Sequence, residues 1–347
     1  MINNRIQLGN VLKFGAFYLT LCMILVACKK EKDEPTETGN IIITEPLEQK
    51  ANYPAAAVAN AIAFSINDKI YVGMGHNATG GKNDLWEYDP TTDKWKEKKN
   101  LPQDNTSDYT EYFVLNDKAY VIVDHKLWEY DPANDDWMQK ADPPMTTIPN
   151  PFSYSFATDS KGYVGGETEL YEYSPDTDTW KQCAEFTGLN RRGVTAVSDG
   201  QKGYIIGGNG IGYPSYESQL ISDNFWTYSP ANDKWSQKAD FPSGIGLVYG
   251  LSFCKENSIY AGLGIESYLY TGSSSSSDIY TYIDAIYKYD AENNSWAQTM
   301  IPPLISKRCE AIGVVCKGKL YIGLGAHVYP HPFSPTEYYL DFWVCNF

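Results

Sequence analysis

The stretch "WEYDPTTDKW", from Trp86 to Trp95, returns later in the chain as "WEYDPANDDW", from Trp128 to Trp137. Three more copies follow: "YEYSPDTDTW" at 171–180, "WTYSPANDKW" at 226–235 and "YKYDAENNSW" at 287–296. A sixth, shorter copy, "WVCNF", begins at Trp343. All nine tryptophans of the chain lie in these phrases, so an internal repeat decides the fold before any other feature does.

Each repeat unit contains four predicted strands in a fixed order. An apolar stretch such as "VTAVSDG" comes first, and a strand that ends in glycines, such as "KGYIIGG", follows it. The aromatic phrase supplies the third strand, and the fourth strand ends on "LP", "FP" or "PP". In "KIYVGMG" and "LWEY" large side chains alternate with small or polar ones, as in half-buried strands. The Asp-Pro pair predicts a tight turn before the final Trp, which can then pack against the neighbouring sheet.

The combination of paired glycines, W/Y-x-Y-D-P and a final Trp resembles the kelch repeat over residues 46–347. A spacing of about fifty residues is typical of kelch propellers, whereas a WD40 propeller is disfavoured because no Trp-Asp dipeptide occurs. The resemblance implies an all-β fold, a six-bladed kelch β-propeller. The second unit, "KAYVIVDHKLWEY", lacks the paired glycines, so we expect its second turn to be built differently.

The N-terminal end of this region predicts how the ring closes. The segment "EQKANYP", Glu48 to Pro54, matches "SQKADFP", Ser236 to Pro242, which is the fourth strand of another unit. The last unit shows only three strands, so the N-terminal strand is expected to complete the last blade and to remove an open edge. Leu47 then stands where the other blades place Trp.

Residues 1–27 are predicted to be a signal peptide, because Arg5 and Lys13 precede an apolar run from Phe14 to Ala27. The run ends in "LVAC", which resembles the lipobox of bacterial lipoproteins and implies lipidation of Cys28; an ordinary secretory signal is the alternative. Residues 28–45 are expected to form a flexible tether. Their charged start resembles the surface-export signal of Bacteroidetes lipoproteins, which implies an outer-membrane lipoprotein that faces the periplasm or the cell surface.

Charge and composition limit the partners. Without Arg5 and Lys13 the chain has 26 basic and 43 acidic residues, a charge near −17, which disfavours nucleic acid and anionic membranes. We therefore expect a monomer that meets a membrane only through Cys28. No metal or cofactor is predicted, because the four histidines (His76, His125, His327 and His331) show no metal-ligand spacing. Five cysteines fall in predicted strands and are expected to pack as buried thiols: Cys183, Cys254, Cys309, Cys316 and Cys345.

Loop length predicts which face of the propeller binds a ligand. The Asp-Pro turns on one face are short, whereas the opposite face carries long loops at 209–223, 265–284 and 326–339. We call this opposite face the loop-rich face. Its aromatic side chains suit sugars or peptides, although some of them can simply pack the loops onto the blades. The candidate ligand-binding residues are Tyr213, Tyr216, Tyr268, Tyr270, Tyr329 and His327, with Tyr280, Tyr282 and Phe333 in the same loops.

Arginine is rare after the signal peptide, where only Arg191, Arg192 and Arg308 occur. All three follow the last strand of one blade and open the next. In kelch families an arginine at this position often faces the central mouth and grips carboxylates, so the three are candidate ligand-binding residues. The alternative is that they hydrogen-bond backbone carbonyls. The sequence leaves open which of Arg191 and Arg192 points inward.

Two functions fit these features. The first is a non-catalytic module that binds a glycan or a protein on the loop-rich face. The second is a sugar-active enzyme that resembles the bacterial N-acetylneuraminate epimerases (mutarotases), with Glu310 or Glu217 as the nearest acid/base candidates. The copper site of galactose oxidase cannot be matched to this chain. Catalytic residues are therefore left unassigned, and binding is the preferred hypothesis.

Overall fold

The computed structural model describes residues 47–106, 109–145, 153–188, 191–210, 222–242, 246–269, 279–300, 305, 307–328 and 336–346. Within these ranges the chain forms strands and no helix. Residues Asn40–Phe347 make up one compact unit. The predicted signal peptide, Cys28 and the tether fall outside the described residues.

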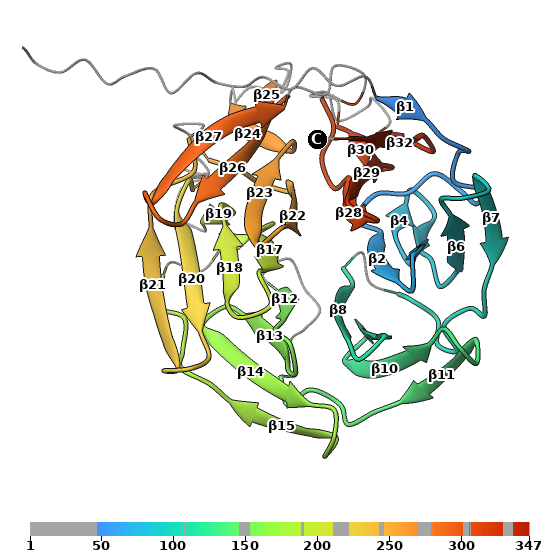
Figure 1. Ribbon diagram of the computed structural model, residues 1–347, viewed down its shortest axis with the longest axis horizontal. Helices are drawn as coiled ribbons and strands as arrows, with labels where there is room; N and C mark the ends of the chain where they lie inside the picture. The colour runs from blue at the N-terminus through green and yellow to red at the C-terminus, as the bar shows by residue number, and fades with distance from the viewer. Residues whose placement is uncertain are drawn as a thin grey trace, which may run out of the picture. The chain divides into compact units, whose positions relative to one another are not determined.

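Six four-stranded antiparallel sheets, the blades, are arranged in a ring (Figure 1). Blade 1 contains β2 (Ile62–Ile66), β3 (Lys69–Gly73), β6 (Leu85–Asp89) and β7 (Lys94–Glu97). Blade 2 contains β8 (Glu111–Leu115), β9 (Lys118–Val123), β10 (Lys126–Asp131) and β11 (Asp136–Gln139). Blade 3 contains β12 (Ser153–Ala157), β13 (Gly162–Gly166), β14 (Glu169–Ser174) and β15 (Thr179–Gln182).

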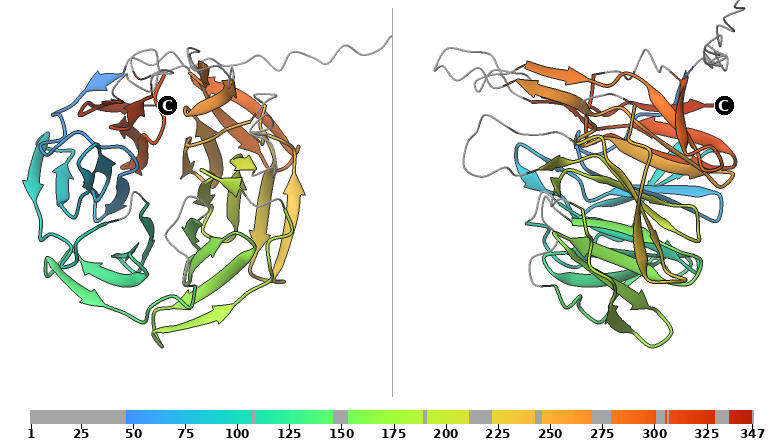
Figure 2. Two further views of the ribbon diagram at one scale, coloured as in Figure 1. Left: turned by 180° about the vertical axis from the view of Figure 1, so that it is seen from behind. Right: turned by 90° about the vertical axis from the view of Figure 1, so that its left-hand side faces the viewer.

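The second half of the ring repeats this order. Blade 4 contains β17 (Thr195–Ser198), β18 (Gly203–Ile206), β20 (Phe225–Ser229) and β21 (Lys234–Lys238). Blade 5 contains β22 (Leu251–Lys255), β23 (Ser258–Gly262), β26 (Ile286–Asp290) and β27 (Ser295–Met300). Blade 6 contains β28 (Ile312–Cys316), β29 (Lys319–Gly323), β32 (Phe342–Cys345) and β1 (Glu48–Gln49). The views in Figure 2 show the sheets set around a central axis.

The predicted closure of the ring is confirmed. Strand β1 pairs antiparallel with β32, with Glu48 opposite Val344 and Gln49 opposite Trp343. The backbone N–H of Lys50 extends this pairing by donating to the carbonyl of Phe342 at 2.8 Å. Leu47, in the position that Trp fills elsewhere, packs against the hydrophobic cluster between blades 5 and 6.

In blades 1 to 5 the repeated phrase joins the blade to the one before it in the ring. In blade 3, Asp178 adopts a left-handed backbone conformation (φ 52°) and accepts the Tyr173 hydroxyl at 2.7 Å and the backbone N–H of Ala141 at 2.9 Å. The indole N–H of Trp180 donates to the carbonyl of the same Ala141 at 2.8 Å. Ala141 follows the last strand of blade 2. The same three bonds recur around Asp93, Asp135, Asp233 and Asn294.

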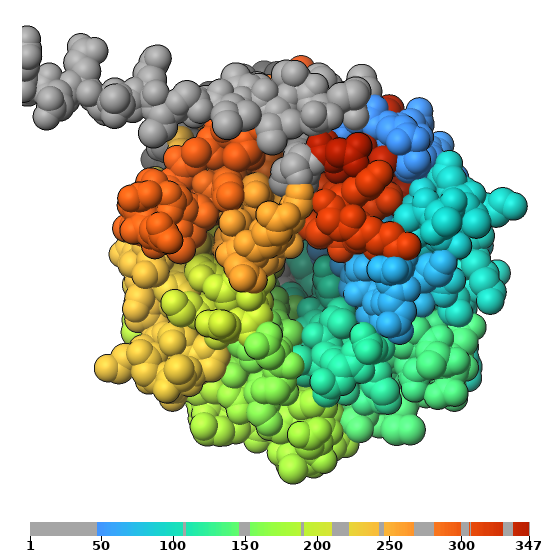
Figure 3. Space-filling view, viewed as in Figure 1, coloured from blue at the N-terminus to red at the C-terminus, as the bar shows by residue number. Residues whose placement is uncertain are grey.

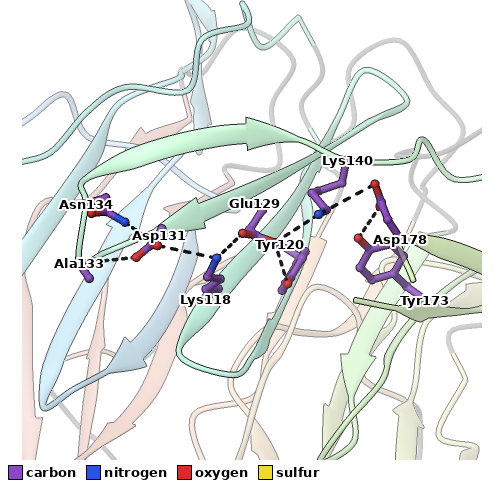
Figure 4. A network of polar contacts seen from close by, with 9 residues as sticks. All are labelled: Lys118, Tyr120, Glu129, Asp131, Ala133, Asn134, Lys140, Tyr173 and Asp178. Carbon is purple, nitrogen blue, oxygen red and sulfur yellow. Dashed lines mark hydrogen bonds and ion pairs between the residues drawn. The ribbon is translucent and has the colours of Figure 1, made fainter. Parts of the chain in front are cut away.

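Ion pairs cross the same junctions. Glu129 of β10 is 8% exposed and accepts hydrogen bonds from the Tyr120 hydroxyl at 2.9 Å and from Lys118 Nζ at 2.5 Å (Figure 4). Lys140 Nζ lies 3.8 Å from Glu129 and 3.9 Å from Asp178 of blade 3. The glutamate of "WEYD" in blade 2 is therefore a buried acceptor whose charge is balanced by two lysines of its own blade, and one of them, Lys140, also reaches Asp178 of blade 3.

The core lies between the blades. Among the described residues there are six hydrophobic clusters, and each one combines side chains from two neighbouring blades. One of them packs Tyr71 of blade 1 against Tyr130 of blade 2, with ring centroids 5.9 Å apart. The cluster between blades 6 and 1 includes Tyr321 and Tyr88, so the hydrophobic packing closes the ring as the strands do.

The connections on the loop-rich face are uneven around the ring. In blade 2, β9 and β10 are joined by Asp124 and His125, both with positive φ, which confirms that this turn is built differently. Blade 3 also has a two-residue turn. The other blades carry extra two-stranded ribbons: β4 (His76–Asn77) with β5 (Gly80–Gly81), β16 (Arg191–Arg192) with β19 (Asn209–Gly210), β24 (Ile265–Leu269) with β25 (Ile279–Tyr282), and β30 (Ala326–His327) with β31 (Glu337–Tyr338).

Cysteine placement follows the prediction only in part. All five described cysteines are free thiols, and four of them are buried, whereas Cys254 is half-buried. Cys183 and Cys309 lie just outside the strands, contrary to the expectation. Over the described part of the chain there is no helix long and apolar enough to span a membrane.

Candidate functional site

A cavity of about 310 Å³ lies on the axis of the ring, which Figure 3 shows hollowed at its centre. The inner strands of all six blades line it: β2, β8, β12, β17, β22 and β28. We call it the channel. Among its lining residues, those with polar side chains are Asn60 with an amide, Glu111 with a carboxyl group, and Thr110, Tyr112, Ser153, Tyr154, Ser155, Thr195 and Ser252 with hydroxyl groups.

A second cavity, of about 110 Å³, adjoins the channel and shares Glu111 and Ser153 with it. Its other side chains come from residues that immediately precede the inner strands, at the crossings from blade to blade. It therefore opens on the loop-rich face, and we call it the mouth. The polar and aromatic side chains that line it are those of Asn60, Tyr109, Glu111, Ser153, Tyr249 and Glu310.

The backbone at the mouth has the same left-handed conformation in four consecutive blades. Gly193, Tyr249, Glu310 and Asn60 each stand two residues before an inner strand, and all have positive φ, between 50° and 65°. The N–H of Tyr249 donates to the carbonyl of Gly193, that of Glu310 to Tyr249, and that of Asn60 to Glu310, at 2.8–3.1 Å. A left-handed conformation is costly for tyrosine and glutamate and persists only where the surroundings enforce it.

Glu310 belongs to a cluster of polar and aromatic groups at the mouth. The Nε2 atom of His76, at the start of β4, lies 3.9 Å from Glu310 Oε2. Burial raises the pKa of Tyr249, the neighbouring Tyr109 and Glu310 raise it further, and Arg192 lowers it. Because their charges and hydrogen bonds affect one another, these side chains form one electrostatic unit.

Glu111, the first residue of β8, lies where the mouth meets the channel. It accepts hydrogen bonds from Ser153 Oγ at 2.8 Å and from Ser155 Oγ at 2.7 Å, both on β12. Burial raises the pKa of Glu111 to about 7, although the two serine hydroxyls oppose the rise. The carboxyl group can therefore exist in either protonation state near neutral pH, which is a common property of functional carboxyl groups.

Arg308 is 3% exposed and is not among the residues that line the mouth or the channel. Its guanidinium makes a bidentate ion pair with Asp341 at 2.7 and 2.9 Å and donates to the carbonyl of Leu324 at 3.0 Å. It also stacks on the ring of Tyr339, with 4.3 Å to the ring centroid. Carbonyl binding, the alternative weighed for this arginine, is therefore what the structure shows, and a role in ligand binding stays a prediction.

Arg191 is the equivalent of Arg308 in blade 4. It is 5% exposed, and its Nη1 donates to the carbonyl of Gly207 and to Ser222 Oγ, both at 2.9 Å. Burial lowers the pKa of Arg191, and Asp223 opposes this. Arg192 is exposed and lies close enough to Tyr249 to affect its pKa. Of the pair, Arg191 points into the protein and Arg192 lies near the mouth.

Most of the tyrosines predicted to bind a ligand fall outside the described residues, namely Tyr213, Tyr216, Tyr270 and Tyr329. The same holds for Phe333, His331 and Glu217. Tyr268 lies in β24. His327 stacks on Tyr282 with ring centroids 5.0 Å apart, and its Nδ1 lies 2.7 Å from the carbonyl of Lys307. This stacked pair joins the ribbons of blades 5 and 6. The described residues hold no group of three or more metal-binding side chains.

Sequence reasoning missed Asn60, Tyr109, Tyr249 and Glu111, and it considered Glu310 only as an acid/base candidate of the enzyme hypothesis. A signal was present, because all of these except Glu111 occupy the same position, two residues before an inner strand. An alignment of the six repeat units on their inner strands would have identified these residues as one set. Glu111 begins a strand at a place where other units have apolar or hydroxyl residues, which is also visible in the sequence.

No protein-family model matches the chain. Over 74 residues, 21% of this chain, it is 35% identical to the N-acetylneuraminate epimerase of Vibrio cholerae serotype O1, and over 95 residues, 27% of this chain, it is 30% identical to the Kelch-like protein 21 of Danio rerio. These matches span only 19% and 13% of the lengths of those two relatives. A solved structure described as "Structure of YjhT" superposes with a TM-score of 0.66 at 16% identity, covering 86% of this chain and 97% of that one. The fold is thus a six-bladed kelch β-propeller, and the structural likeness, at this identity, extends to the fold alone.

Proposed function

We propose that this propeller is a binding module for a small saccharide, which it takes up in the mouth on its loop-rich face. The observation that carries the proposal is the mouth itself. It is a concave site where side chains from several blades converge, and it continues into a channel lined by hydroxyl groups. Ligand sites of this kind combine a preformed hollow with a few placed polar groups.

The chemistry of the lining suits a polyhydroxylated ligand. Asn60 offers both a donor and an acceptor, Tyr109 and Tyr249 offer apolar ring faces with hydroxyls, and Glu310 offers a strong acceptor. The left-handed, hydrogen-bonded backbone at Asn60, Tyr249 and Glu310 fixes the points from which these side chains leave the chain, which lowers the entropic cost of binding.

The test is titration calorimetry of the purified protein against neutral, amino and acidic monosaccharides and their short oligomers. Asn60→Gly removes the mouth amide while keeping a residue that tolerates φ 50°. We expect an affinity loss of about tenfold, the equivalent of one hydrogen bond. Asn67→Gly is the matched control, since Asn67 has φ 51° in the β2–β3 turn on the opposite face. Equal affinity in both variants would place the site elsewhere.

A second candidate is a sugar epimerase or mutarotase. The observation that favours it is the pairing of Glu310 with His76 Nε2 at 3.9 Å in the mouth, because such a pair can move a proton. The partial similarity to the V. cholerae epimerase adds support. NMR can follow the interconversion of sugar anomers and epimers with the protein and with Glu310→Gln. Turnover by the wild type that is lost in this variant would establish catalysis. Binding without turnover would support the non-catalytic binding module instead.

We retain the lipid anchor as a second part of the proposal. The sequence "LVAC" and the charged residues after Cys28 support an outer-membrane lipoprotein that faces the periplasm or the cell surface. Cys28→Ser should release the protein from the membrane fraction or leave its signal unprocessed. Membrane association and processing that are the same as in the wild type would refute the lipid anchor.

A further inference from the structure

The charges at the mouth indicate the class of saccharide that fits. Among the described residues that line the mouth, Glu111 and Glu310 are the acidic ones, and neither lysine nor arginine is present. The buried arginines Arg191 and Arg308 are bonded to other protein groups, and the exposed Arg192 lies outside this lining, near Tyr249. A carboxylate ligand would therefore meet like charge in a narrow cavity, which costs free energy.

Both glutamates are held in place by the fold. Glu310 is set by its left-handed backbone and by the hydrogen bonds of its N–H and C=O to Tyr249 and Asn60. Glu111 is set by two serine hydroxyls, each donating to a different carboxylate oxygen. The Glu111 carboxylate is therefore preorganised, and the Glu310 backbone directs its side chain from a fixed position at the mouth.

We propose that the mouth selects saccharides that carry a protonated amine, bound by Glu310 and Glu111, over saccharides that carry a carboxylate. This inference rests on the proposed saccharide-binding function and specifies its ligand. It separates this chain from the acidic sugar named in its epimerase relative.

Binding of such a cation has a consequence for protons. Near pH 7 about half of the Glu111 carboxyl groups carry a proton, and an ammonium group beside them favours the ionised form. Binding should therefore release protons from Glu111. The titratable and charged groups of the neighbouring elements are Tyr112 on β8, Tyr154 on β12, Tyr109, Tyr249 and Glu310 at the mouth, His76 beside Glu310 and Arg192 near Tyr249.

The experiment compares glucosamine, glucose and N-acetylneuraminic acid by titration calorimetry on the same protein. We expect glucosamine to bind at least about tenfold more tightly than either of the others, as one favourable charge contact would give. Glu310→Gln should reduce the affinity for glucosamine about tenfold and change that for glucose less than about twofold. Glu97→Gln, an exposed glutamate on β7, is the matched control and should change neither.

Proton release is read from titrations in two buffers of different ionisation enthalpy. The difference between wild type and Glu111→Gln isolates the proton of Glu111 from any proton that the amine itself takes up. We expect that difference to be up to about half a proton per ligand at pH 7. If wild type and Glu111→Gln release the same number of protons, Glu111 is not part of the binding site.

The outcomes separate the two proposals. Equal binding of glucose and glucosamine, or tighter binding of N-acetylneuraminic acid that is lost in Arg192→Ala, would overturn the amine preference and leave saccharide binding intact. Failure of all three sugars, and of the wider panel, would overturn both.

Discussion

At the scale of the residue, the structure explains why the phrase "YDPxxDxW" is repeated. Its second acidic residue binds its own blade through a tyrosine hydroxyl and the preceding blade through a backbone N–H. In the fifth copy Asn294 makes the same bonds as the aspartates do, so the acceptor oxygen matters more than the charge.

Asp233 provides a test of this point. Asp233→Ala leaves the Tyr228 hydroxyl and the Ala184 N–H without their acceptor, and we expect it to lower the free energy of unfolding by about 1–2 kcal/mol. Asp233→Asn keeps the acceptor, as Asn294 does, and should cost less than about 1 kcal/mol. Denaturant unfolding of both variants at pH 7 measures the difference; equal losses would mean that the charge, and not the acceptor, stabilises the junction.

The same residue should respond to acid. The backbone N–H of Ala184 and the Tyr228 hydroxyl hold the pKa of Asp233 below its ordinary value. The stabilisation is therefore complete above the unfolded-state pKa of about 4 and is lost as the pH falls through the lower folded-state pKa. Asp233→Asn should flatten the decline in stability below pH 4. A decline as steep as in wild type would contradict this assignment.

Arg308 should matter for stability. Removing its side chain leaves Asp341 without its cationic partner and the Leu324 carbonyl without the guanidinium donor, so Arg308→Ala should cost about 3 kcal/mol or more. Arg192→Ala, which changes an exposed arginine, should cost less than about 1 kcal/mol. Urea unfolding of the two proteins provides the comparison. Similar stability in both would show that the buried pair contributes little.

At the scale of the element, one two-residue strand closes the ring. Lys50→Pro removes the N–H that donates to Phe342 at 2.8 Å, next to β1, whereas Lys50→Ala keeps it. We expect the proline variant to melt several degrees below the alanine variant, because its last blade loses pairing at an edge. Melting curves that coincide would show that β1 contributes little to closure.

The elements also show how far the sequence could predict this molecule. Strand order, blade number and closure of the ring can be predicted, because the period of the repeat and its turn residues are visible in the amino-acid sequence. The site is harder to predict, because Arg308 and Tyr249 both lie at crossings from one blade to the next but differ in what surrounds them. Only the paths of neighbouring loops determine that the arginine is covered by Asp341 and Tyr339 while the tyrosine lines the mouth.

At the scale of the whole molecule, all six blades enclose one titratable carboxyl group, that of Glu111. Its pKa is raised to about 7, so the folded protein retains a proton that the unfolded chain releases above about pH 4.5. Stability should therefore fall as the pH rises from about 4.5 to 7, by up to about 3 kcal/mol. Thermal unfolding between pH 4 and 8 should show this slope in wild type and lose it in Glu111→Gln. If Glu111→Gln showed the same pH dependence of stability as wild type, other titratable groups would be responsible for it.

The pairing of β1 with β32 has a consequence for synthesis. Strand β1 is among the first parts of the propeller to leave the ribosome, and its partner at Phe342–Cys345 is among the last. Until then the nascent chain can stack blades in order but has nothing to pair with its first strand, and both ends of the growing stack remain open edges. Completion of the ring is thus a single late event, in which the earliest and the latest residues of the domain meet.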